Sequence, residues 1–139
     1  MKTLISLLIL AAGSATLCAQ NSLSVTADIP FAFYVGDRQM PAGEYQTVQL
    51  GQVLVMVQHA DGKEAAFRSM IPASAKDRPT TSSLVFRNYG DRYFLAKIWR
   101  AGSQRGAEFS KSKKEREAVS STLVSATRPT TVIILARSR

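Results

Sequence analysis

The sequence has very little of the two residue types from which metal centres and disulfide frameworks are built. Its 139 residues include one cysteine, Cys18, and one histidine, His59. One thiol and one imidazole cannot fill a tetrahedral metal shell, and a single cysteine cannot form an internal disulfide. The composition therefore excludes a disulfide scaffold, and it predicts neither a metal site nor a cofactor.

Long apolar runs are also scarce, and the one that is present lies at the start of the chain, over residues 4–12. Its length is typical of the apolar region of a signal peptide and is short for a membrane span. Small residues follow it, and cleavage after Ala15 or after Ala19 fits, of which we favour Ala19. We predict a signal peptide over residues 1–19, one domain over 20–139, export to the periplasm or the extracellular space, and no transmembrane helix after cleavage.

The lone cysteine raises the alternative of a lipid anchor. An acylated cysteine normally follows a small residue, whereas Leu17 precedes Cys18 here. We therefore disfavour lipid anchoring and expect Cys18 to leave with the signal peptide, which gives a mature chain without cysteine.

The remainder of the chain reads as a foldable β domain. It belongs to a sequence that is 45% hydrophobic and 20% charged, which excludes a disordered or collagen-like chain. Short β-rich runs alternate with turn signals, a pattern typical of a small sandwich or barrel. We predict an all-β, mainly antiparallel domain of about seven or eight strands. The expected strands cover residues 29–35, 44–50, 53–57 (buried on both faces), 64–70, 83–88, 92–99 and 132–135, with loops at 71–80 and 100–106.

One short basic helix is expected near the C-terminus, at about residues 113–120. Ser112 and Glu115 have the spacing of a capping box, and Lys113 and Glu117 have that of an i,i+4 ion pair. The apolar run that follows Pro129 predicts a last, central strand.

Positive charge is concentrated in the last forty residues. The formal net charge is +8, yet residues 20–99 hold 8 basic and 7 acidic side chains, whereas residues 100–139 hold 9 basic and 3 acidic ones. This asymmetry allows two interpretations: a solvated helix face that contributes charge for solubility, which we favour, and an anion-binding face. Anionic polysaccharide or a membrane surface fits it better than nucleic acid, because only Phe109 is available for base stacking nearby. The candidate anion-binding residues are Arg105, Lys111, Lys113, Lys114 and Arg116.

The sequence offers little for catalysis. It contains neither a glycine-rich phosphate loop nor a G-x-S-x-G nucleophile elbow. His59, next to the Asp61-Gly62 turn, is the only imidazole base, and no nucleophile is identifiable beside it. We predict no catalytic residues and no enzyme activity.

The aromatic side chains allow two interpretations. They are most simply the core of the domain, and alternatively they line a cavity for an apolar ligand inside a small barrel. They are Phe31, Phe33, Phe67, Phe86, Tyr93, Phe94 and Trp99. The leading expectation is a non-enzymatic envelope or extracellular binding or structural module with a basic C-terminal face, and the ligand-binding barrel is the alternative.

The run from Ile29 to Tyr45 reads IPFAFYVGDRQMPAGEY. It resembles an N-terminal signature of small exported bacterial proteins of unknown function, which read roughly I/V-P-F-x-F-x-V-G-x-x-x-x-P-A-G-x-Y. Residues 94–99 and 111–117 resemble downstream blocks of the same group. The resemblance implies an exported protein but no particular activity. In physical terms the signature describes a scaffold: an apolar strand, a tight turn with Pro41 and Gly43, and a return strand anchored by Tyr45.

Overall fold

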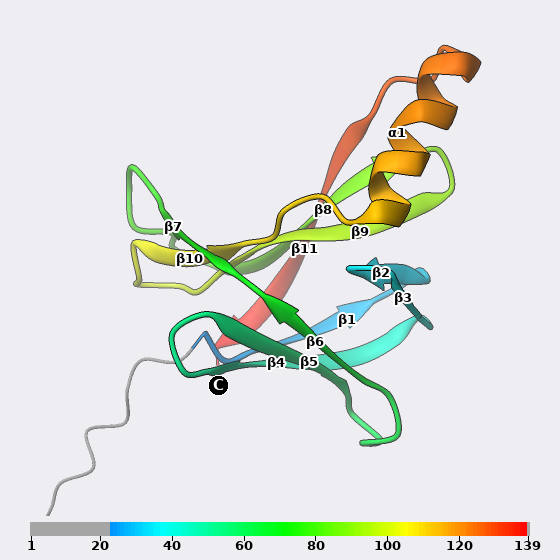
Figure 1. The fold of residues 1–139 in the computed structure, drawn as a ribbon. Helices are drawn as coiled ribbons and strands as arrows, with labels where there is room; N and C mark the ends of the chain where they lie inside the picture. The colour runs from blue at the N-terminus through cyan, green and yellow to red at the C-terminus, as the bar shows by residue number, and fades with distance from the viewer. Residues whose placement is uncertain (1–22, 139) are drawn as a thin grey trace, which may run out of the picture.

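Strands make up most of the computed structural model, which describes residues 23–138 (Figure 1). The predicted signal peptide and Cys18 lie outside the described residues. One helix, α1 (Lys113–Ser125), is present in the described part of the chain. The strands are β1 (Val25–Ile29), β2 (Phe33–Val35), β3 (Arg38–Met40), β4 (Gly43–Leu50), β5 (Leu54–His59), β6 (Ala65–Ser69), β7 (Ile71–Ser74), β8 (Ser82–Tyr89), β9 (Arg92–Trp99), β10 (Arg105–Glu108) and β11 (Thr130–Ser138).

The strands form one sheet that curves round into a nearly closed barrel. Its main path runs β3-β2-β9-β8-β11-β1-β4-β5-β6. After Met70 the chain continues from β6 into β7, which pairs with β10, and β10 pairs in turn with β9, so the path returns to β9. Every pair is antiparallel except β2 with β9. The predicted all-β, mainly antiparallel fold with one C-terminal helix is therefore confirmed, in its barrel form.

The number of strands exceeds the prediction because several segments are short and broken. The described residues form eleven strands. The β2–β3 hairpin is an addition at the edge of β9, and β6 and β7 form one strand bent at Met70. If the two strands of the hairpin are left out and the bent strand is counted once, the barrel wall has eight strands. Eight strands enclose an interior that side chains can fill.

The interior is filled by side chains that alternate along the strands. Val25, Ala27 and Ile29 of β1 are buried, as are Val55 and Val57 of β5. This period of two is expected where one face of a strand meets the core and the other meets solvent. The barrel therefore has one continuous hydrophobic core.

Several aromatic rings of the core are packed directly against one another. The Phe33 ring centroid lies 4.9 Å from that of Tyr45 and 5.4 Å from that of Phe86, both in edge-to-face geometry. Phe31 meets Phe86 edge-on at 5.2 Å and stacks on Tyr93 at 3.9 Å. Edge-to-face and offset stacking are the favourable arrangements of aromatic rings. This packing supports the core interpretation of these rings and argues against an apolar ligand among them. Phe67 is 58% exposed on β6, so its assignment to the core is wrong.

Two predicted strands differ from the structure. The expected strand 29–35 is interrupted at residues 30–32, where Pro30 cannot donate to a ladder, and it becomes β1 and β2. The run 53–57 is not buried on both faces, because Leu54 and Met56 are only half-buried and Val53 is exposed. Its outer face has no covering layer, so β5 alternates like its neighbours.

Two strands lie in segments that were expected to be loops. β7 falls within the expected loop 71–80, and β10 begins within the expected loop 100–106. Each is a strand because it pairs with the other, with Arg105 opposite Ser74 and Glu108 opposite Ile71. The Trp99 ring covers the Cα of Gly106, where a Cβ would overlap it. The pairing is therefore a tertiary effect, favoured by a glycine that lets the indole lie close to the strand.

The helix begins where predicted but runs further. Ser112 is its N-cap and accepts a hydrogen bond from the Glu115 N–H, yet the Glu115 side chain turns to the barrel and does not close the capping box. Lys113 and Glu117 form no ion pair among the described residues. The helix ends at Ala126, which has a left-handed φ of 56°, shortly before Pro129. The predicted last strand is confirmed as central, because β11 lies between β8 and β1.

Candidate functional site

Two of the three sequence blocks that carry the resemblance, 29–45 and 111–117, meet in space at the start of α1. The Ser112 hydroxyl donates to the Gly36 carbonyl at 3.0 Å, and the Lys114 N–H donates to the Asp37 Oδ1 at 2.9 Å. The hydrogen bond from Lys114 lowers the pKa of Asp37 below its usual value. The β2–β3 turn therefore caps the helix, and this part of the signature holds the scaffold together.

One turn further along α1, a buried carboxylate fixes the helix to β8. Glu115 is 2% exposed and is bound in bidentate fashion by the Arg87 guanidinium, with Nη2–Oε2 at 3.1 Å, while the Tyr89 hydroxyl donates to Oε1 at 2.9 Å. Although burial opposes the charge on Arg87, the hydrogen bonds and charge of Glu115 raise its pKa. Burial and Glu115 also raise the pKa of Tyr89 to about 12. These groups satisfy one another, which indicates a structural role.

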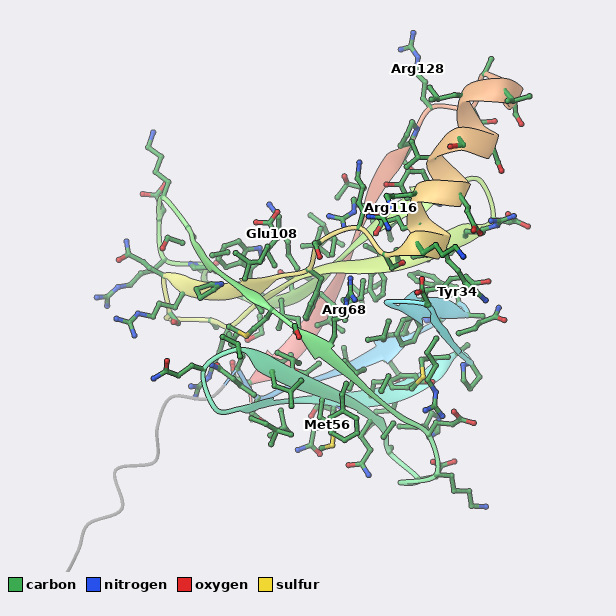
Figure 2. All side chains as sticks on the ribbon, in the orientation of Figure 1. Tyr34, Met56, Arg68, Glu108, Arg116 and Arg128 are labelled. Carbon is green, nitrogen blue, oxygen red and sulfur yellow. The ribbon has the colours of Figure 1, made fainter. Side chains whose placement is uncertain are left out.

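The Glu115–Arg87–Tyr89 cluster is called the clamp from here on. The predicted basic residues of this segment surround it. Lys111, Lys113 and Arg116 are exposed, and the Lys114 ammonium lies 5.6 Å from the centre of the Tyr34 ring (Figure 2). A helix N-terminus already has a positive partial charge, so cations there are electrostatically unfavourable apart from the compensation by Asp37 and Glu115. These four residues lie together, but the structure shows no concave site among them.

His59, the only histidine, is engaged in local contacts. Its Nδ1 lies 3.0 Å from Asp61 Oδ1 and accepts the Asp61 N–H at 3.2 Å, and its ring meets Tyr45 edge-on. The other edge of the ring lies over Gly43, where a Cβ would overlap Nε2. The imidazole therefore braces the signature turn, in keeping with its structural interpretation.

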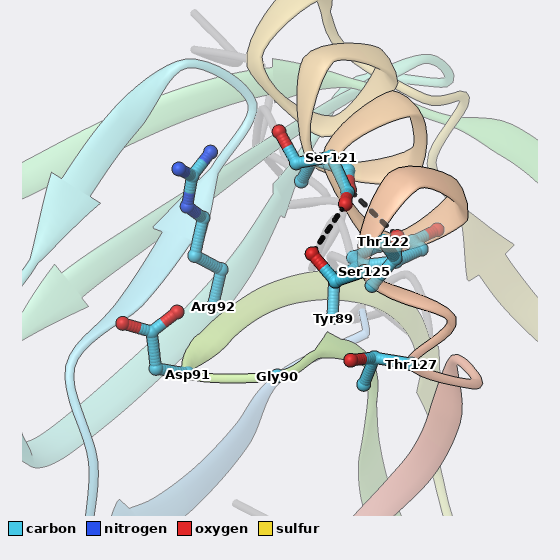
Figure 3. A pocket seen from close by; sticks show the side chains of 9 residues that line it. Tyr89, Gly90, Asp91, Arg92, Ser121, Thr122, Ser125 and Thr127 are labelled. Carbon is cyan, nitrogen blue, oxygen red and sulfur yellow. Dashed lines mark hydrogen bonds between the residues drawn. The ribbon is translucent and has the colours of Figure 1, made fainter.

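A small pocket of about 160 Å³ lies between α1 and the β8–β9 turn (Figure 3). Its walls are rich in hydroxyl groups, but the helix hydroxyls Ser121, Thr122 and Ser125 are already bonded to backbone carbonyls. Thr122 donates to Ala118, and Ser125 donates to Ser121. Hydroxyls committed in this way are poorly placed to recognise a ligand, so the pocket is a gap beside the helix.

A much larger groove, of about 940 Å³, lies at the opposite end of β8 and β9. Its walls come from residue 23, the β4–β5 turn, the β7 segment up to Arg78, and the loop 100–106. Three arginines line it, and we name it the arginine groove after them: Arg78, Arg100 and Arg105. Glutamine and serine side chains occupy much of the remaining wall, with Met70 and Pro72 among the apolar ones.

The side chains of the three groove arginines have no partners among residues 23–138. Among the described residues, none of their guanidinium groups forms a hydrogen bond or an ion pair with another side chain or carbonyl. No carboxylate lines the groove, although the exposed Asp77 precedes Arg78 in the chain. Three arginines elsewhere in the described part of the chain are instead paired with carboxylates: Arg38 with Glu64, Arg87 with Glu115, and Arg137 with Glu44.

The structure therefore divides the predicted anion-binding residues between two places. Arg105 lines the groove, whereas Lys111, Lys113, Lys114 and Arg116 lie at the start of α1. Sequence reasoning missed Arg78 and Arg100, which were placed in loops. Their only local signal is their position in polar loops at the ends of predicted strands. They lie 22 positions apart in the chain, so no local pattern joins them.

Comparison of the chain with protein families, curated proteins and solved structures finds no match. Within residues 23–138 there is no cluster of three or more histidine, cysteine or acidic side chains able to hold a metal ion. No helix in this part of the chain is long and apolar enough to cross a bilayer. The site must therefore be interpreted from its own chemistry.

Proposed function

We propose that the chain is a non-enzymatic, exported binding module that holds anionic groups in the arginine groove. One observation carries this proposal: within residues 23–138, three guanidinium groups without side-chain or carbonyl partners line one groove, and no carboxylate of this part of the chain lines it. A guanidinium keeps its charge at every physiological pH and offers a planar fork of donors to carboxylate, sulfate or phosphate. Anionic groups are therefore the ligands that these side chains fit best.

The rest of the groove suits a ligand that is polar between its charges. Gln49, Gln52 and Gln104 contribute amide groups, and Ser74 and Ser103 contribute hydroxyls. The volume of about 940 Å³ is at the upper end of the range of small-molecule sites, so the groove accommodates a segment of a larger ligand. The clamp at α1 supplies no comparable concave surface.

The test compares two triple variants with the same change in net charge. Arg78→Gln/Arg100→Gln/Arg105→Gln removes the groove charges, and Lys111→Gln/Lys113→Gln/Arg116→Gln removes those beside α1. With dextran sulfate as the probe at moderate salt, we expect the groove variant to raise Kd by about tenfold or more, because each lost ion pair contributes on the order of 0.5–1 kcal/mol. The variant beside α1 should raise Kd by less than about threefold.

Equal losses in the two variants would show that only the net charge matters, and a larger loss in the second would place the site at α1. Either outcome overturns the proposal. Because Arg100 is half-buried, the double variant Arg78→Gln/Arg105→Gln is measured alongside, with circular dichroism to establish that each variant is folded.

A further inference from the structure

The β4–β5 hairpin, which forms one wall of the arginine groove, is unusually free of charge. From Tyr45 to Ala60 the chain contains no lysine, arginine, aspartate or glutamate. The tip of this hairpin exposes two apolar side chains, Leu50 at 41% and Val53 at 59%, on either side of Gly51 and Gln52. Those two middle residues line the groove, so the apolar tip stands at its rim.

The apolar surface continues from the tip along the outer face of the barrel. Val48 lies opposite Met56, and Met56 lies opposite Phe67 on β6, so the three side chains form one row across three strands. Phe67 is 58% exposed, and Met56 lies on the outer side of these strands in Figure 2. The helix packs on β8 instead, and no other described element covers this row.

We infer that this end of the molecule docks on a lipid bilayer whose headgroups are anionic. The inference rests on the proposed function, because it takes the arginine groove as the anion site and names the lipid phosphates as the anions. The arginines are placed to bind headgroups while Leu50 and Val53 enter the boundary between headgroups and acyl chains. Peripheral proteins combine these two contributions, buried apolar area and attraction to anionic lipid.

Charge complementarity favours this occupant over the others. An anionic polysaccharide would satisfy the arginines but would leave Leu50, Val53 and the row behind them in water. A second copy packed tip to tip would bring two unpaired arginine grooves close together, and the like charges would repel. A bilayer surface alone offers negative charge and an apolar phase within a few ångströms of each other.

The test uses the mature chain with vesicles of phosphatidylcholine, with and without phosphatidylglycerol. Leu50→Ser/Val53→Ser removes the apolar tip, and Leu123→Ser/Val124→Ser is the matched control, since those side chains are 78% and 90% exposed at the far end of α1. In cosedimentation we expect the wild type to bind only the vesicles with phosphatidylglycerol. The tip variant should lose about tenfold or more in partitioning, and the control should match the wild type.

The depth to which the tip enters the bilayer is measured separately, with a tryptophan placed at the tip. Fluorescence of the Val53→Trp variant should be quenched by brominated acyl chains, and that of Leu123→Trp should not be. Quenching at neither position, or at Leu123→Trp alone, would overturn insertion of the tip.

The remaining outcomes separate the two proposals. The tip variant should bind dextran sulfate as the wild type does, because its arginines are intact. Membrane docking is overturned if the wild type binds dextran sulfate but no vesicles, or if the tip variant binds vesicles normally. In both cases the proposed function still stands. If the wild type is a dimer and the tip substitutions dissociate it, the occupant of the tip is a second copy, and membrane docking is overturned. Loss of dextran sulfate binding in the tip variant alone would overturn both assignments.

Discussion

Three residues at the signature turn, Gly43, Tyr45 and His59, show why particular residues are required there. The Tyr45 hydroxyl donates to the Pro41 carbonyl at 2.5 Å, and its ring packs edge-on against His59. Burial, with the charges of Glu64 and Asp61, raises the pKa of Tyr45 to about 12. The imidazole in turn lies directly over the Cα of Gly43. The P-A-G-x-Y segment is therefore a packing unit in which glycine leaves room for histidine.

We predict that Gly43→Ala lowers the free energy of unfolding by about 2 kcal/mol, because residues other than glycine rarely adopt the φ of 155° found there and because the new methyl group overlaps the His59 ring. Gly51→Ala is the control, since Gly51 has a left-handed φ of 68° but a methyl group there would meet nothing within 4 Å. Backbone conformation alone should cost that variant about 1 kcal/mol. Urea denaturation measures both, and equal losses would show that the contact with His59 contributes nothing.

The helix is attached to the barrel by polar contacts to a greater extent than by apolar burial. Of its buried residues, Glu115 and Thr122 are polar and only Ala118 is apolar. Ala118, Tyr89 and Phe94 form a small cluster separate from the main core. The Glu115–Arg87 pair is therefore the main determinant of where the helix lies.

We predict that Glu115→Ala destabilises the protein by about 3 kcal/mol, because it leaves the charge of the largely buried Arg87 without a carboxylate, with only the Phe109 carbonyl as a partner. Adding Arg87→Leu should recover part of that loss, since the uncompensated charge is then removed as well. Chemical denaturation of the wild type, both single variants and the double variant gives the coupling between them. Additive effects would show that the two residues do not act as a pair.

The contact between Asp37 and Lys114 makes the attachment of α1 dependent on pH. The folded-state pKa of Asp37 is lowered, so its contribution to stability is present at neutral pH and is lost as the pH falls below about 4. Asp37→Asn should reduce Tm at pH 7 and should show a smaller further fall between pH 5 and 3 than the wild type. Asp28→Asn, an equal change of charge on β1, is the control. An unchanged pH profile in Asp37→Asn would contradict this role.

On the scale of the entire barrel, charge and apolar surface are unevenly distributed. The arginine groove lies at one end of β8 and β9. The helix α1 lies at their other end, beside the β8–β9 turn (Figure 1). The segment from Tyr45 to Ala60, which has no lysine, arginine, aspartate or glutamate, adjoins the groove. This polarity gives the molecule one end suited to an anionic surface, while the core and the clamp maintain its shape.

We predict that binding of dextran sulfate depends strongly on salt. Raising NaCl from about 0.1 M to about 1 M shortens the screening length from about 10 Å to about 3 Å, which weakens attraction between exposed charges. The wild type should lose at least tenfold in affinity by isothermal titration, and the groove triple variant should show a clearly shallower dependence, because it has fewer charges to screen. Parallel salt profiles would contradict a role for the groove.

Much of the fold followed from local patterns in the chain. Alternation with a period of two and turn residues predicted most of the strands and the β class, and Ser112 predicted the start of α1. These features depend on neighbours within a few residues, which is why the sequence carries them directly. The same logic placed His59 and the signature turn in the scaffold.

Tertiary structure decided what no local pattern contains. β7 and β10 are strands only because each pairs with the other, and Glu115 turned from a capping role to Arg87 because barrel closure brings β8 beneath the helix. The arginine groove joins side chains from loops about 20 or more residues apart, with Arg105 as its only predicted member. Net charge and its position along the chain were readable from the sequence. Which charges remain unpaired, and on which concave surface, depends on how the closed sheet places its loops.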